Sequence, residues 1–313
     1  MKIAVFGAGG IGGYLAGRLA ESGEDIAIIA RGEHLHAIRT NGLRVDSIKG
    51  DFVANPSIAT DNPEDVGPVD VVILGVKAWQ IADAAEALRP LIGDDTCVLP
   101  LQNGVEATSE LTEILGESHV LGGLGGILSY IAGPGHIRHA GGEPFLKFGE
   151  IDNRSRPRTN NLLEAFQRAG IQSEIPSNID SAIWEKFMFI TAVSGVGALT
   201  RVPTGIWRSL PETWAMAVAI VKEAESVAIA LDVPMSGNKS DAVISQLQKL
   251  QPHGTVSMQR DIMEGRPSEL EVQNGAIVRL GLTAGVPTPV NDFIYHSLLP
   301  QEKRARGEFE DIT

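Results

Sequence analysis

A glycine-rich stretch near the N-terminus has the residue types and spacing to hold a phosphate group. Gly7-Ala8-Gly9-Gly10-Ile11-Gly12 fits the pattern G-x-G-x-x-G and directly follows the apolar run Lys2-Ile3-Ala4-Val5-Phe6. In this pattern Gly7 permits a tight turn, Gly9 lets a pyrophosphate approach the backbone, and Gly12 lets the next helix pack on the strand. A helix over residues 11–21 would point free N–H groups and its positive dipole end at the phosphates. The stretch therefore predicts a dinucleotide site; the alternative is a structural glycine turn in another α/β protein.

The residue after the second expected strand indicates which dinucleotide binds. That strand, residues 26–30, ends in Ala30 and is followed by Arg31, with Glu33 close behind. An acidic residue at the strand end favours NAD, whereas a nearby arginine suits the 2′-phosphate of NADP. We therefore expect NADP(H), with the Arg31 guanidinium bound to that phosphate. The alternative is a solvated surface arginine.

One lysine lies on an unusually apolar helix. A helix is expected over residues 180–199; it contains Trp184-Glu185-Lys186, and Lys186, Ile190 and Ser194 share one of its faces. Burying a charged ammonium is unfavourable unless it is paired, so Lys186 needs a reason to be there. The alternative is a lysine that extends its ammonium to the surface.

The order of elements predicts how these residues are positioned. In the N-terminal part, strands are expected at 2–6, 26–30, 43–48, 51–58, 69–74, 96–100, 119–123, 145–149 and 171–175, with helices at 11–21, 33–40, 81–91, 107–115 and 160–169. This alternation predicts a parallel sheet with helices on both faces, and ligands bind beyond the carboxyl ends of such strands. We expect the glycine loop, the Lys77 loop and the Asn103 loop there. The glycine-rich residues 122–142 are expected to add antiparallel extensions to this sheet.

The pattern becomes helical after residue 176. Helices are expected at 180–199, 211–231, 238–250, 255–264, 268–283 and 289–298, followed by a charged, frayed tail from Gln301. We therefore predict an α/β Rossmann-type N-terminal domain over residues 1–176 and an all-α C-terminal domain over residues 177–313.

Composition narrows the class of protein. The 313 residues are 43% hydrophobic and 21% charged, with a net charge of −13, so nonspecific binding to nucleic acid is not expected. With Cys97 alone no internal disulfide is possible. We expect no signal peptide ahead of the first strand, and no apolar run reaches the ~20 residues of a membrane span. We expect a cytoplasmic protein with no membrane partner. No metal site is expected, since His34 and His36 would point apart on a helix, and His136 and His139 are expected at the surface.

Taken together, these motifs resemble a known family. Gly7 to Gly12, Val76-Lys77-Ala78-Trp79-Gln80, Gln102-Asn103-Gly104, Trp184-Glu185-Lys186, Ser257-Met258, Ser268-Glu269 and Asn274-Gly275 stand in the order and spacing of ketopantoate reductases (2-dehydropantoate 2-reductases). The resemblance implies a Rossmann domain, a C-terminal domain of the 6-phosphogluconate-dehydrogenase-like helical type, and an active site in the cleft between them. It also implies NADPH-dependent reduction of ketopantoate to pantoate, in pantothenate and coenzyme A synthesis, and a possible homodimer.

The resemblance also assigns roles to single residues. Lys186 corresponds to the family's catalytic lysine, the general acid, and Glu269 to its substrate-cleft glutamate. Glu269 could orient Lys186 or accept a hydrogen bond from a substrate hydroxyl. Lys77 and Asn103 correspond to its loop residues that face cofactor and substrate, and Ser257 to a serine that contacts the substrate carboxylate.

The sequence departs from the family pattern on the lysine helix. Ketopantoate reductases carry Asn four and eight residues after the lysine, where this chain has Ile190 and Ser194. Ser194 keeps one hydroxyl for a small-molecule 2-oxo acid, and Thr191 is a further candidate, but Ile190 has no group that can hydrogen-bond. The substrate could therefore be ketopantoate or another 2-oxo acid or ketone. A cofactor-binding sensor without catalysis is a third possibility.

Overall fold

The computed structural model describes residues 1–235 and 237–309. By its internal contacts the chain divides into two compact units. The first contains Met1–Gln102 and Glu106–Ile179, and the second contains Asp180–Thr313 together with Asn103–Val105. The main division falls between Ile179 and Asp180, and a three-residue loop of the N-terminal half is grouped with the helical unit by its contacts.

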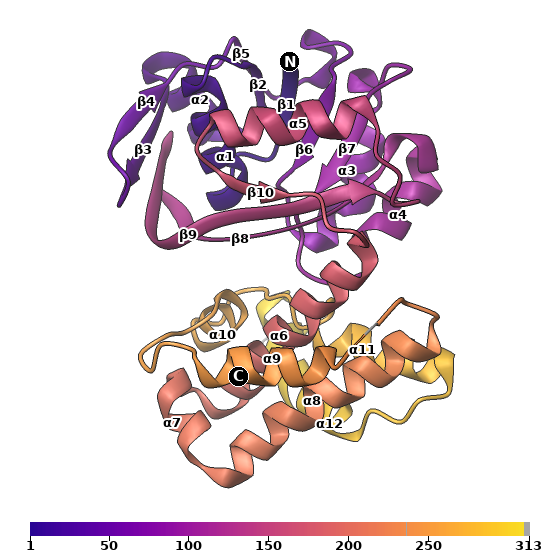
Figure 1. The fold of residues 1–313 in the computed structure, drawn as a ribbon. Coiled ribbons are helices and arrows are strands. Elements are labelled where there is room, and N and C mark those ends of the chain that lie inside the picture. The colour runs from indigo at the N-terminus through magenta and orange to yellow at the C-terminus, as the bar shows by residue number, and fades with distance from the viewer. Residues whose placement is uncertain (236, 310–313) are drawn as a thin grey trace. The chain divides into compact units, whose positions relative to one another are not determined.

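The N-terminal unit contains the expected parallel sheet (Figure 1). Its strand order is β5-β2-β1-β6-β7, and every neighbouring pair is parallel. The strands are β1 (Lys2–Phe6), β2 (Asp25–Ile29), β5 (Ile58–Thr60), β6 (Val71–Leu74) and β7 (Cys97–Pro100). The central strands are almost continuously apolar and buried, as strands covered on both faces must be. Helices α1 (Gly10–Glu21), α2 (Gly32–Asn41), α3 (Ile81–Ala87), α4 (Ala107–Leu115) and α5 (Pro157–Arg168) complete the unit with several short 3₁₀ turns.

A second five-stranded sheet corrects one of our expectations. The glycine-rich strands β8 (Leu121–Gly133) and β9 (His136–Glu150) do not extend the first sheet. They pair with each other antiparallel, and β9 also pairs with β3 (Leu43–Ser47) and β10 (Gln172–Glu174), while β4 (Phe52–Ala54) pairs with β3. Residues 51–58, expected as one strand, divide between the two sheets as β4 and β5, with Pro56 between them. Proline has no N–H to donate to a ladder, which explains the interruption.

Glycines on two faces of α1 allow it to lie between the two sheets. A Cβ at Gly12 would lie 2.1 Å from the carbonyl oxygen of Gly7, on the side of the first sheet. Three glycines face the second sheet. A Cβ added at Gly10 would lie 2.4 Å from Ser129 O. A Cβ at Gly13 would lie 2.7 Å from the Ile137 side chain, and one at Gly17 would lie 3.0 Å from the Val45 side chain. These distances are below normal carbon contacts, so the second sheet can approach only a helix that lacks side chains there.

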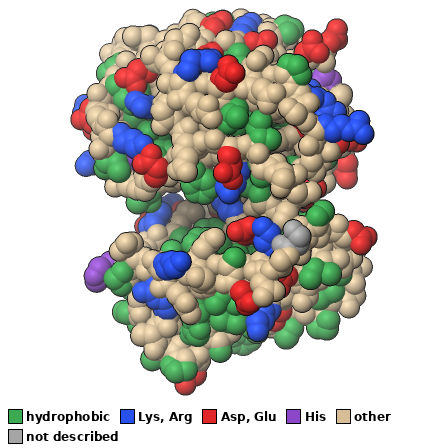
Figure 2. Space-filling view, in the orientation of Figure 1, with side chains coloured by type: hydrophobic (Ala, Val, Ile, Leu, Met, Phe, Trp, Pro, Cys, Tyr) green, Lys and Arg blue, Asp and Glu red, His purple; other side chains and the backbone are tan. Residues whose placement is uncertain are grey.

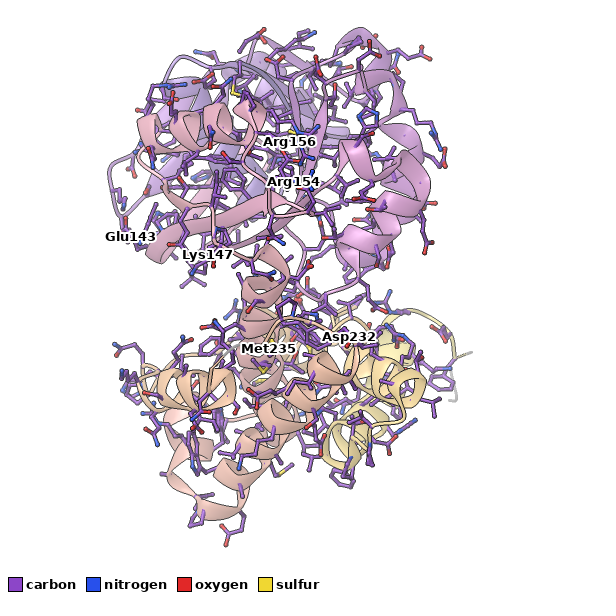
Figure 3. All side chains as sticks on the ribbon, turned by 45° about the vertical axis from the view of Figure 1, so that its right-hand side comes forward. Glu143, Lys147, Arg154, Arg156, Asp232 and Met235 are labelled. Atoms are coloured by element: carbon purple, nitrogen blue, oxygen red, sulfur yellow. The ribbon has the colours of Figure 1, made fainter. Side chains whose placement is uncertain are left out.

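Ion pairs hold the outer parts of the second sheet. Figure 3 labels Glu143 and Lys147 on β9; Glu143 pairs with Lys49, and Lys147 pairs with Glu174 of β10. Arg156, labelled in the same view and located just before α5, donates to the Asp152 carboxylate from Nη1 at 2.8 Å and from Nη2 at 2.7 Å. Charges of both signs are interspersed over the visible face of this unit in Figure 2.

Two predictions about buried polar residues had different outcomes. Cys97 is buried on β7 as expected, and burial raises the pKa of its thiol to about 12, which makes it a poor nucleophile. The prediction that His139 lies at the surface is wrong, since only 1% of it is exposed. Its Nδ1 contacts the Ser47 hydroxyl and its Nε2 contacts Gly142 O, both at 2.9 Å, so the ring is fully used by β3 and β9.

The second unit is helical around a single apolar core. It contains α6 (Ile179–Thr200), α7 (Thr204–Ser209), α8 (Pro211–Ala230), α9 (Lys239–Gln248), α10 (Ser257–Met263), α11 (Asn274–Ala284) and α12 (Pro289–Ala305). Of the described helices α6 alone has the length and apolar composition to cross a membrane, but 67% of its most apolar window is buried inside the structure, as for a central core helix. Helix α7 was not predicted from the sequence.

Two helix boundaries differ from the expectation for identifiable reasons. Residues 269–273 form a bend and turns in place of a helix, Ser268 donates from its backbone N–H and its hydroxyl to the Glu302 carboxylate, and helix α11 begins only at Asn274. The tail from Gln301 is not frayed up to Ala305. Helix α12 continues through Pro300, and Arg306 closes its end by donating to Glu302 Oε1 at 2.7 Å.

Candidate active site

Lys186, Asn103 and Glu269 form a hydrogen-bonded chain within the helical unit. Lys186 Nζ on α6 donates to Asn103 Oδ1 at 3.0 Å, and Asn103 Nδ2 donates to Glu269 Oε2 at 2.8 Å. Gln273 Nε2 also donates to Glu269 Oε2, at 3.3 Å. Both ends of the Asn103 amide are engaged, so its orientation is set. Glu269 therefore acts on Lys186 through Asn103 rather than by a direct hydrogen bond.

Burial changes the acidity of the lysine. Desolvation lowers the pKa of Lys186 to about 8, and the Glu269 carboxylate opposes part of that fall. Only 7% of Glu269 is exposed. An ammonium with such a pKa is mostly protonated at neutral pH and yet gives up its proton more readily than an ordinary lysine. These are the properties of a general acid.

Local backbone features bring the three side chains together. Gly104 has φ +101°, a conformation that favours glycine, and a Cβ there would lie 2.9 Å from Val272 O. The loop that carries Asn103 can therefore lie against the segment that precedes α11. The same segment carries Glu269, directly after Ser268, which Glu302 holds.

The glycine loop of the N-terminal unit has the geometry that a dinucleotide needs. Gly7 has φ +97° at the end of β1, and Gly12 packs against the carbonyl of Gly7. At Gly9 a Cβ would meet nothing closer than Gly75 O at 3.8 Å, so the missing side chain leaves open space beside the start of α1. That space and the free N–H groups of the first turn fit a pyrophosphate. Gly10 is needed for contact with β8, a reason that the motif alone does not reveal.

Arg31 and Lys77 are exposed at the ends of parallel strands. Arg31 follows β2 and precedes the first residue of α2, and its guanidinium makes no hydrogen bond or ion pair within the described residues. Lys77 begins the 3₁₀ turn Ala78–Gln80 after β6; its backbone N–H donates to Gln80 Oε1 at 3.1 Å, and its ammonium lies 5.6 Å from the centre of the Trp79 ring. Both side chains are exposed at the edge of the sheet where the glycine loop lies.

Comparison with known proteins identifies the family. The family model described as ketopantoate reductase PanE/ApbA matches residues 3–153, and the model of its C-terminal domain matches residues 178–302. This chain belongs to the ketopantoate reductase family. It is accordingly an oxidoreductase of the kind that acts on CH–OH groups.

Individual relatives match this chain over almost its whole length. It is 33% identical to the 2-dehydropantoate 2-reductase of Mesorhizobium japonicum, over 94% of this chain and 95% of that one. A crystal structure of a ketopantoate reductase family member from Ralstonia eutropha aligns with a TM-score of 0.87 at 31% identity, covering 98% and 100% of the two chains. D-mandelate dehydrogenase with NADH and anilino(oxo)acetate aligns with a TM-score of 0.88 at 24% identity, covering 98% and 99%; that likeness concerns the fold.

The other residues predicted to contact the substrate are not part of the Lys186–Asn103–Glu269 chain. Ser194 and Thr191 are completely buried, and neither hydroxyl has a hydrogen-bond partner among the described residues. Ile190 is partly exposed on the same helix, and Ser257 is half-buried at the start of α10. Substrate binding by Ser194 and Ser257 therefore stays a prediction.

One supporting residue escaped the sequence analysis. Gln102, 7% exposed, donates from Nε2 to Leu74 O and Val76 O at 2.9 Å each, and its Oε1 accepts from Leu101 N at 3.1 Å. It thus joins the ends of β6 and β7 and supports the loop that carries Lys77. The position of Gln102 next to Asn103, in the Gln102-Asn103-Gly104 motif, was the sequence feature that could have indicated this role.

Proposed function

We propose that this protein reduces the ketone of a small 2-oxo acid with NADPH, and that ketopantoate, converted to pantoate for pantothenate synthesis, is the first substrate to test. The observation that carries the proposal is the Lys186–Asn103–Glu269 chain, in which a neutral amide orients an ammonium of lowered pKa. Relatives named 2-dehydropantoate 2-reductase support the choice of ketopantoate.

The residues divide the chemistry between them. When bound, NADPH would supply a hydride to the carbonyl carbon, and negative charge would then develop on the carbonyl oxygen. Lys186 has three N–H donors and Asn103 uses one, so the ammonium can hold that oxygen and transfer a proton to it. Ketone, hydride and proton together give the alcohol, and Lys186 regains its proton from solvent. Asn103, itself held by Glu269, keeps the ammonium in place, and the Glu269 carboxylate favours its charged form.

The first experiment is steady-state NADPH oxidation with ketopantoate. Efficient turnover would support the full proposal. Thr191, Ser194 or water would then do the work of the two asparagine side chains that the family carries at positions 190 and 194. Negligible turnover despite NADPH binding would favour the second candidate, a reductase for another 2-oxo acid, and a panel of such acids would follow. Ile190 motivates this candidate because a site without a hydrogen-bonding partner discriminates against substrates that need one. Tight NADPH binding with no NADPH oxidation in the presence of any 2-oxo acid would favour the third possibility, a cofactor-binding sensor without catalysis.

The rate of reduction should depend on pH through Lys186. The free enzyme needs a protonated ammonium, so kcat/KM should fall about tenfold per pH unit above a pKa of about 8. Glu269→Gln removes the carboxylate that raises this pKa, and the falling limb should move to lower pH. Profiles of kcat/KM for both proteins test this; a limb at the same pH in the variant would contradict it.

Replacing Arg31 should change the choice of cofactor. Arg31→Glu removes a guanidinium proposed to bind the 2′-phosphate and puts a carboxylate there, so the Kd for NADPH should rise about 10- to 100-fold while NADH binding is unchanged or stronger. Arg39→Glu is the matched control, because it makes the same change of charge at another exposed position on α2. Equal loss for NADPH and NADH in Arg31→Glu would contradict the assignment.

A further inference from the structure

His34 connects three segments of the N-terminal unit. It lies in the first turn of α2, three residues after Arg31, and is half-buried. Its Nδ1 accepts a hydrogen bond from the backbone N–H of Gly135, at the turn between β8 and β9, at 3.0 Å. The carbonyls of Ala8, in the glycine loop, and of Gly133 also interact with the ring.

The hydrogen bond to Gly135 defines the protonation state of the ring. Because Nδ1 accepts, the neutral imidazole carries its proton on Nε2, which is buried and has no hydrogen bond of normal geometry among the described residues. Burial lowers the pKa of His34, and the two carbonyls oppose this only in part. The ring is therefore neutral at neutral pH, and its Nδ1 is available to hold the turn.

The β8–β9 hairpin is packed against both of the other segments. Gly135 has φ +64°, and a Cβ there would lie 2.8 Å from the Ala37 Cβ of α2. At the glycine loop, a Cβ at Gly10 would lie 2.4 Å from Ser129 O of β8. The hairpin thus touches the helix that follows Arg31 and the loop proposed to hold the pyrophosphate, and His34 bonds the hairpin where the three segments meet.

The same helix turn also carries Arg31. The carbonyl of Arg31 accepts from Leu35 N at 3.3 Å, so a shift of the first turn of α2 would move Arg31. We propose that His34 is a positioning residue for the dinucleotide: by holding the hairpin turn through Nδ1, it sets the spacing between the glycine loop and Arg31. This inference rests on the proposed function, because it takes the glycine loop and Arg31 to bind the same cofactor.

The test compares three replacements of His34 in the full chain. His34→Asn places an amide oxygen where Nδ1 lies, His34→Gln places its amide near the Nε2 position, and His34→Ala removes both. His36→Ala is the matched control, since His36 is exposed on the same helix. Kd values for NADPH and NADH are measured by fluorescence titration without any 2-oxo acid, together with melting temperatures and kcat at saturating cofactor.

Positioning through Nδ1 predicts a specific order among the variants. His34→Ala and His34→Gln should raise the Kd for NADPH about tenfold, and His34→Asn should stay within about threefold of the parent, with kcat at saturation unchanged within about twofold. His36→Ala should have no effect.

Two results would overturn the inference. One is a Kd within about twofold of the parent in both His34→Ala and His34→Gln, even if their melting temperatures fall. The other is equal weakening in His34→Asn and His34→Gln, a comparison that remains available if His34→Ala does not fold. If the parent protein binds NADH rather than NADPH, the NADP part of the proposed function fails, and the same comparison with NADH still decides the role of His34, because both cofactors carry the pyrophosphate.

Discussion

Lys186→Met is expected to lower kcat/KM for reduction by about 10³- to 10⁴-fold, with the Kd for NADPH unchanged. Loss of a general acid alone is worth about 10²- to 10⁴-fold, and the ammonium also stabilises the developing charge on the substrate oxygen. Methionine has a similar length and no charge to desolvate, so folding stability should not fall. Steady-state kinetics, cofactor titration and a melting curve together test this expectation.

The control for this variant is another lysine of the helical unit. Lys239 is half-buried and pairs with Glu185, the residue next to Lys186, at 2.8 Å. Lys239→Met removes an ammonium from the same neighbourhood without touching Asn103 or Glu269, and should leave kcat/KM within about threefold. Turnover in Lys186→Met close to that of the control would exclude the proposed role of Lys186.

Gly9→Ala and Gly12→Ala are expected to fail in different ways although they lie three residues apart. Alanine fits at Gly9, where φ is −71° and ψ −163° and the new Cβ would meet only Gly75 O at 3.8 Å. The methyl group would nevertheless occupy the space proposed for the pyrophosphate, so the Kd for NADPH should rise about 10- to 100-fold with an unchanged melting temperature. At Gly12 the Cβ would lie 2.1 Å from Gly7 O, and α1 must move away from β1.

The two glycine variants are distinguished by stability. Gly12→Ala should destabilise the fold by about 3–5 kcal/mol, equivalent to a fall of about 10 °C in melting temperature for a domain of this size. Thermal unfolding followed by circular dichroism, with NADPH titration of the folded protein, separates the two effects. A stable Gly12→Ala protein would contradict the packing argument, and undiminished NADPH affinity in Gly9→Ala would contradict the assigned place of the pyrophosphate.

Features that depend on neighbouring residues could be predicted from the sequence. The turn at Gly7, the apolar strands of the first sheet and the apolar lysine helix each depend on neighbouring residues, so their types and spacing predicted them correctly. The family was likewise apparent from motifs spread along the chain. Lys186 stood out because a charge within an apolar helix is unfavourable without a partner.

Tertiary structure decided what depends on residues far apart in the chain. The sequence suggested that Glu269 could orient Lys186, but only the fold shows Asn103 between them, because the three residues lie on separate segments. Likewise the glycine-rich residues of β8 and β9 could be predicted as strands, but nothing in their residue types says which sheet they join. The contact of the Ser129 carbonyl on β8 and the Ile137 side chain on β9 with the glycine face of α1 decides it, and this contact forms only when the segments pack.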